Sequence, residues 1–142
     1  MDFNLERFKK AQSYDYDNAL REIRSGRKRS HWMWYIFPQV RGLGHSSMAD
    51  YYGISGTEEA KAYLADPILG SILFEISKSL MELDDKDAAR IFGYPDVLKL
   101  RSCMTLFAAV SEEDSVFQQV LDAYYRGEKD GQTLRIIRRT EG

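Results

Sequence analysis

The sequence has little of what marks secreted or membrane proteins. Cys103 is the only cysteine among 142 residues, so no disulfide forms within the chain. No stretch approaches the about eighteen apolar residues of a membrane-spanning helix. The first residues, Met1–Arg7, lack the apolar core of a secretory signal. We therefore expect a cytoplasmic protein that does not bind a membrane.

The chain also has no large excess of charge of one sign. Its 20 basic and 22 acidic residues give a net charge of −2, and the sequence pI is about 5.7. Many nucleic-acid-binding domains have a pI above about 9, so the charge balance argues against a nucleic-acid partner. Basic side chains do gather at Arg24–Arg29. A nucleic-acid-binding module that uses them together with exposed aromatics therefore stays as an alternative.

No linker rich in proline, glycine or serine divides the chain, and it contains no internal repeat. Hydrophobic residues make up 44% and aromatic residues 13% of the sequence, which is enough for a packed core. We expect a single domain over residues 1–142.

Helical periodicity dominates the sequence, and strand signals are scarce. Only Trp32–Phe37 resembles a buried strand, and so short a run is equally compatible with a buried helical turn. We therefore expect a compact all-α bundle of about six to eight helices with little or no strand. Helical segments are expected over about residues 5–12, 15–25, 48–52, 57–65, 66–83, 87–92, 95–110, 113–126 and 130–139.

The segment over residues 66–83 carries the clearest helix signal. Asp66 is suited to cap free amides, and Pro67 fits the first turn, where its missing N–H is no loss. Apolar residues follow at spacings of three and four and form one stripe: Leu69, Ile72, Leu73, Ile76, Leu80 and Leu83. This pattern predicts a long helix that faces the core.

The most distinctive segment runs from Arg27 to Ser47. A basic run leads into an aromatic block and then a glycine-containing loop, and both tryptophans and both histidines of the chain lie here. The apolar members of the block fit a central core element: Trp32, Met33, Ile36 and Phe37. His31 and Trp34 combine a flat apolar ring with a polar nitrogen, which suits ligand contact as well as burial.

Three features after the aromatic block are suited to recognition. The Gln39 amide donates and accepts hydrogen bonds. Arg41 and His45 lie beside two glycines and ahead of a short helix, with Ser46 or Ser47 as its cap. Such an arrangement could form an anion cradle, although an ordinary capped loop is the more common reading of these residue types. The loop matches no nucleotide-binding motif, because it lacks the third glycine and the lysine that those motifs require.

A second candidate lies in the segment over residues 95–110. On a helix, Arg101, Ser102 and Thr105 lie on one strip, where the guanidinium could bind a carboxylate or phosphate and the hydroxyls could assist. If the strip faces water, or if Arg101 pairs with an internal acid, no site is formed. Cys103 lies in an apolar stretch and is expected to be a small buried residue. The His and Cys spacing predicts no metal site.

The residues of these two segments closely resemble the small bacterial family known as domain of unknown function 1810. The resemblance covers almost the whole chain and is carried by Arg27–Gln39, Gly42–Gly44, Ser47–Ala49, Phe92–Asp96 and Lys99–Phe107. It implies a compact, mainly helical protein, and it implies no activity, cofactor or catalytic residue. The label calpastatin, given to some relatives, does not suit this chain, because its composition is compact and unrepeated.

We hypothesise that a pocket between the His31–Ser47 segment and the Arg101 helix binds an anionic or nucleotide-like small molecule. Such a pocket should contain Trp34 and at least one of Arg101, His31 and His45. No catalytic residue or cofactor is identified, so whether the protein is an enzyme stays open. A helical protein-interaction or homo-oligomeric module is a further alternative, and the oligomeric state, monomer or homodimer, is open.

Overall fold

The computed structural model describes residues 3–141, and within them the fold is all-α, as expected. Nine helices are formed in this part of the chain, and the only β-type pairing there is an isolated parallel bridge between Val40 and Ile54. The helices are α1 (Glu6–Arg24), α2 (Met33–Ile36), α3 (Ser47–Tyr52), α4 (Thr57–Ala65), α5 (Pro67–Met81), α6 (Ala88–Phe92), α7 (Asp96–Ala109), α8 (Val116–Tyr125) and α9 (Gly131–Glu141). Among the described residues, no helix has both the length and the apolar character that crossing a membrane requires.

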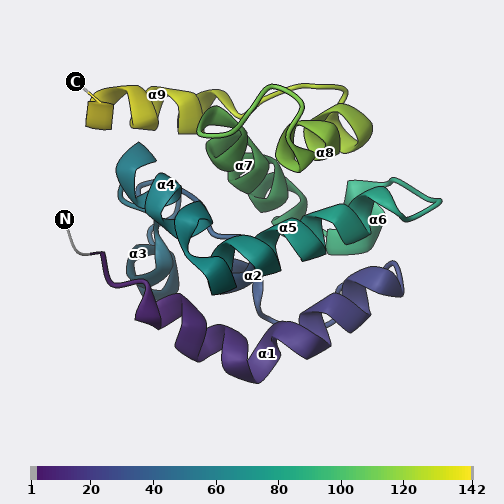
Figure 1. Ribbon diagram of the computed structural model, residues 1–142. Helices are drawn as coiled ribbons and strands as arrows, with labels where there is room; N and C mark the ends of the chain where they lie inside the picture. The colour runs from purple at the N-terminus through teal and green to yellow at the C-terminus, as the bar shows by residue number, and fades with distance from the viewer. Residues whose placement is uncertain (1–2, 142) are drawn as a thin grey trace.

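The helices pack around α5 and α7. Figure 1 shows α5 across the middle of the molecule, with α1 along one side and α9 along the other. Helix α7 packs against α4, α6, α8 and α9. From Leu100 to Phe107 it is buried at every position except Arg101, which is only partly buried. Within residues 100–107, Arg101 is therefore the one side chain that extends partly out of the core.

The long core helix begins and packs as its sequence indicates. The Asp66 carboxylate accepts hydrogen bonds from the amides of Ile68 and Leu69 at 2.9 and 3.0 Å, and Pro67 occupies the first turn. The inward stripe is fully buried at Leu69, Leu73, Ile76 and Leu80. The helix ends at Met81, two residues before the expected Leu83. Helix ends are the part of a pattern that is least sharply encoded.

The first two expected segments form one continuous helix, α1. Figure 1 shows α1 bent near its middle rather than interrupted. Ser13, close to the expected break, donates its hydroxyl to the carbonyl of Lys10 at 2.6 Å, a bond that is often associated with helix bending. The side chain of Ser115 caps α8, and Gly56 precedes α4.

The aromatic block is a helical turn inside the core, not a strand. Helix α2 spans Met33–Ile36, and the apolar side chains predicted to be core are at most 2% exposed: Trp32, Met33, Ile36 and Phe37. The backbone of the following loop then pairs with the segment after α3. This pairing holds the loop over residues 39–44 against the bundle, where it faces α7.

Candidate functional site

A buried carboxylate organises the start of the aromatic block. Glu22 is 7% exposed, and its Oε1 accepts from the amides of Arg29 and Ser30 and the indole of Trp32 at 2.7, 3.1 and 3.0 Å. Its Oε2 accepts from the Asn18 amide and the Ser30 hydroxyl at 2.9 and 2.6 Å. Burial alone raises the pKa of Glu22, but these hydrogen bonds outweigh it and lower the pKa to about 2. We call these residues the Glu22 cluster.

Two lysines connect the aromatic block to the start of α7. Lys28 and Lys99 lie 2.8 and 3.5 Å from the Asp96 carboxylate. The Lys28 ammonium also lies 5.0 Å from the ring centroid of Trp32, and that of Lys99 lies 5.1 Å from the ring centroid of Trp34. Each tryptophan therefore has a cation over its face, although only the ring of Trp34 is partly exposed.

The side chains of the basic run over residues 24–29 differ in their surroundings. Arg24, Arg27 and Arg29 are exposed, whereas Lys28 is turned towards Asp96. Trp32 is fully buried and offers no ring for a base to stack on. A nucleic-acid interface at this run would need another exposed aromatic side chain.

A surface hollow of about 380 Å³ lies between the loop after α2 and the first half of α7. The start of α9 forms its third wall. Its polar and charged lining includes Gln39, Lys99, Arg101, Ser102, Asp130 and Gln132. We call it the Arg101 hollow. Sequence reasoning placed a pocket between these two segments, and three of the residues named then, Gln39, Arg101 and Ser102, line this hollow.

Arg101 has unused hydrogen-bonding capacity in this hollow. Its side chain is 27% exposed, and its Nε is buried without a hydrogen-bond partner among the described residues. Within that part of the chain, the carboxylate in ion-pair range is that of Asp130, whose Oδ1 lies 4.0 Å from Nη2, beyond hydrogen-bond distance. A guanidinium carries five N–H donors, so this cation can accept a further anionic partner.

The hydroxyls on the same strip of α7 hold Asp130. Ser102 donates to Asp130 Oδ2 at 2.9 Å, and Thr133 donates to the same oxygen at 2.5 Å. Thr105 accepts from the Asp130 amide at 2.9 Å and donates to the Arg101 carbonyl at 2.8 Å. Ser102 and Thr105 thus fix the start of α9 beside Arg101, and contact between their hydroxyls and a ligand stays a prediction.

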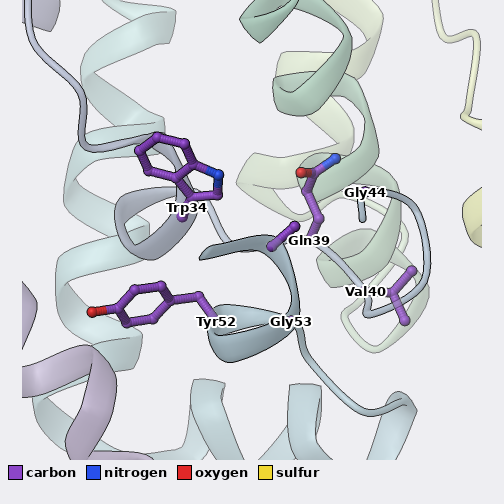
Figure 2. Close-up of a pocket in the computed structure, with 7 residues that line it drawn as sticks. Trp34, Gln39, Val40, Gly44, Tyr52 and Gly53 are labelled. Carbon is purple, nitrogen blue, oxygen red and sulfur yellow. The ribbon is translucent and has the colours of Figure 1, made fainter. Parts of the chain in front are cut away.

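A much smaller hollow adjoins the Arg101 hollow and is lined by Trp34, Gln39 and Gly44. Figure 2 shows the Trp34 indole beside the Gln39 amide, with the indole nitrogen on the side of Gln39. The small hollow has a volume of about 10 Å³, which is room for about one water molecule. Trp34 and Arg101 therefore line separate hollows, and Gln39 and Gly44 belong to both.

His45 lines a third hollow, of about 260 Å³, between the loop and α9. Arg135 and Arg139 line it from α9, and Leu43 and Gln132 line both this hollow and the Arg101 hollow. We call it the His45 hollow. The two hollows adjoin at Leu43 and Gln132, between the loop over residues 39–45 and helices α7 and α9, and we refer to them together as the groove.

Three of the residues named from the sequence do not line these hollows. Thr105 is buried within α7, and the other two lie elsewhere. His31 is exposed just before α2, and Ser47 is the exposed first residue of α3; neither lines the three hollows described above. The cap of α3 is Ser46. Arg41 donates to backbone carbonyls towards the other end of that helix, not to its first turn. Contact of His31 or Ser47 with a ligand stays a prediction.

Sequence reasoning missed several residues of the groove. Lys99, Asp130, Gln132, Arg135 and Arg139 are not among the residues that the sequence pattern singles out. The local pattern indicates that a helix starts at Asp130. Asp130 comes close to Arg101, however, only because α9 packs against α7, which is a tertiary contact. No periodicity within a single segment encodes that contact.

The described part of the chain can also be compared with the requirements of metal sites and reactive thiols. No group of three or more His, Cys, Asp and Glu side chains there is placed to hold a metal ion. Cys103 is fully buried, as expected, and burial raises the pKa of its thiol. A thiol in this state is a poor nucleophile.

Comparison with known proteins gives a family and no activity. Residues 2–137 match the family model described as "Protein of unknown function (DUF1810)". The crystal structure of the conserved hypothetical protein Rv1873 from Mycobacterium tuberculosis is similar over 96% of this chain and 97% of that one, with 45% sequence identity and a TM-score of 0.93. A comparison with curated proteins gave no match. The resemblance noted from the sequence is thus confirmed, and the chain belongs to the DUF1810 family.

Proposed function

We propose that the protein binds an anionic small molecule in the Arg101 hollow. The observation that carries this proposal is the Arg101 guanidinium, whose Nε is buried without a partner and whose carboxylate neighbour lies 4.0 Å away. Buried polar groups in folded proteins are nearly always hydrogen-bonded. The exposed part of the guanidinium lines the hollow, and among the described residues its carboxylate neighbour is beyond hydrogen-bond distance, so a ligand in the hollow can supply an acceptor to its terminal nitrogens.

The other lining groups suit an anion with a polar and an apolar part. A guanidinium binds a carboxylate or phosphate through two parallel N–H bonds. Lys99 adds a second positive charge, and the Gln39 and Gln132 amides supply donors and acceptors. Pro95 and Leu98, which line the same hollow, offer apolar contact. Asp130 opposes an anion, but its Oδ2 is already occupied by Ser102 and Thr133.

The position of Trp34 beside the Arg101 hollow also suits a nucleotide-like ligand, whose base would stack on the indole ring. Lys99 lies over the Trp34 ring and 3.5 Å from Asp96. An anion bound at Arg101 would offer Lys99 a further partner, and movement of Lys99 towards it would free the Trp34 face for a flat heterocycle. The small hollow at Trp34 has no room for a ring and is not lined by Lys99, so a base would stack on the ring face that Lys99 covers and would require this movement.

The test is a thermal-shift screen of the purified protein against nucleotides, sugar phosphates and carboxylates, followed by calorimetric titration of the hits. A ligand that binds the native state raises the unfolding temperature by mass action. Arg101→Met should weaken binding of a hit about tenfold or more, because it removes charged hydrogen bonds.

Arg90→Met serves as the matched control, since it removes an exposed guanidinium on α6. It should leave the affinity unchanged. Equal affinity of the wild type and Arg101→Met for every hit would contradict the proposal.

A further inference from the structure

We propose that the His45 hollow is a second anion subsite, and that the ligand is an extended small molecule with an anionic group near each end. This inference rests on the proposed function of the Arg101 hollow. The two hollows share Leu43 and Gln132, so one molecule lying in the groove would contact both.

The cations of the second subsite converge on one side of α9. Arg135 and Arg139 are four residues apart, which places them on successive turns of the same helix face, about 6 Å apart along the axis. Both line the His45 hollow, and the His45 imidazole lines it from the loop. The lining contains no acidic side chain.

These arginines are also free of internal partners. Neither Arg135 nor Arg139 has a carboxylate within 4.0 Å among the side chains that the structure describes. Arg139 lies in the last turn of α9, where the helix dipole favours a cation, whereas Arg135 lies in the middle of the helix. The dipole does not explain why they share a hollow with His45 on a separate loop, whereas an anion held between them does.

The spacing along α9 limits the class of ligand. Asp130, beside Arg101, precedes Arg135 by five residues and Arg139 by nine, which corresponds to about 8 and 14 Å of helix. Two directly linked phosphoryl groups are too close together to reach both subsites. The geometry suits anionic groups about 10 Å apart, joined by a part that contacts Leu43 and Gln132 in the middle of the groove.

The experiment uses synthetic anions of defined length. Affinities of the purified protein are measured by calorimetry for alkyl monophosphonates and for alkane bisphosphonates whose two groups are separated by two to ten carbons. We expect a bisphosphonate of the longer spacers to bind about tenfold or more tightly than the monophosphonate, because its second group binds intramolecularly. The short-spacer compound should gain little.

Variants then test which residues cause the higher affinity for the long bisphosphonate. The double variant Arg135→Gln, Arg139→Gln should bind the long bisphosphonate no more tightly than the monophosphonate, with monophosphonate affinity unchanged. The matched control is Arg138→Gln, which removes an exposed cation from the same helix that does not line the groove. It should bind like the wild type.

Two outcomes overturn the inference and separate it from the proposed function. If all bisphosphonates bind like the monophosphonate, and Arg101→Met still abolishes binding, the second subsite is wrong and the Arg101 site stands. If no phosphonate binding depends on Arg101, both proposals fail. Dependence on spacer length in the wild type decides the inference even if a variant does not fold.

Discussion

The Glu22 cluster and the Arg101 hollow each contain a charged side chain at the edge of the same core, and the two side chains differ in how completely they are hydrogen-bonded. Glu22 accepts five hydrogen bonds from Asn18, Arg29, Ser30 and Trp32. Arg101 keeps a buried donor without a partner. The carboxylate is fully hydrogen-bonded within the chain, whereas under the proposed function the guanidinium takes a further acceptor from a ligand.

The difference separates structural from functional charge. A fully hydrogen-bonded buried carboxylate fixes local geometry, here the entry of the chain into the aromatic block. A cation with free donors beside a hollow contributes little to folding and retains binding capacity. The segment with the most conspicuous sequence, Arg27–Phe37, thus mainly builds the core, while the groove beside it is lined by less conspicuous residues.

The largest expected effect comes from breaking the Glu22 cluster. Glu22→Ala leaves buried donors on the backbone and on Trp32 unpaired and should lower the free energy of unfolding by about 3–5 kcal/mol. Urea denaturation followed by circular dichroism measures it. Glu128→Ala removes an exposed carboxylate and should change stability by less than about 0.5 kcal/mol. Similar losses in both variants would contradict the structural role.

A smaller loss is expected where α7 holds α9. Thr105→Val keeps the shape of a side chain that is 1% exposed but removes its bond to the Asp130 amide. The free energy of unfolding should fall by about 1–2 kcal/mol. Thr105→Ser, which keeps the hydroxyl, should preserve the bond. An equal or greater loss in the serine variant would show that packing of the methyl group, not the hydrogen bond, is responsible.

The pH dependence of stability should reveal Glu22 directly. Its pKa is lowered from 4.5 in the unfolded chain to about 2 in the fold. The stabilisation is therefore fully present above the unfolded pKa and is lost as the pH falls through the folded one. Urea midpoints between pH 5 and about pH 2 should fall less steeply in Glu22→Gln than in the wild type. Parallel curves would contradict the lowered pKa.

The smallest stability effect is expected at Arg101. Arg101→Met removes a partly exposed cation whose carboxylate neighbour is 4.0 Å away, so the free energy of unfolding should change by less than about 1 kcal/mol. Thermal unfolding without ligand measures this. A loss as large as that of Glu22→Ala would place Arg101 among the structural charges and remove the contrast between the two regions.

The sequence predicts the helices better than the site. Periodicity and caps locate α5 almost to its ends, because the Asp66 cap and the apolar stripe are local signals. Predicted burial of Trp32 and Phe37 is confirmed for the same reason. The joining of the first two segments into α1 is missed, because the polar residues between them carry no apolar periodicity.

The candidate site depends on contacts between distant segments. The pattern places Arg101 on a polar strip of α7, but it does not reveal that Asp130 and Gln132 meet this strip across 25 or more residues. The pattern also predicts that the Ser102 and Thr105 hydroxyls contact a ligand, which stays a prediction. It does not reveal that both hydroxyls form hydrogen bonds with Asp130 at the start of α9. Partners of this kind are set by tertiary packing and not by local spacing.

The most direct test of the contrast between the two regions is one NMR titration with a monophosphonate. The chain has two tryptophans, so the indole N–H signals of Trp32 and Trp34 distinguish the Glu22 cluster from the small hollow that adjoins the Arg101 hollow. We expect the Arg101 Nε–H and Trp34 indole signals to shift with ligand concentration while the Trp32 signal stays in place. An unchanged Arg101 signal at saturating ligand, or a shift of Trp32 as large as that of Trp34, would contradict the account.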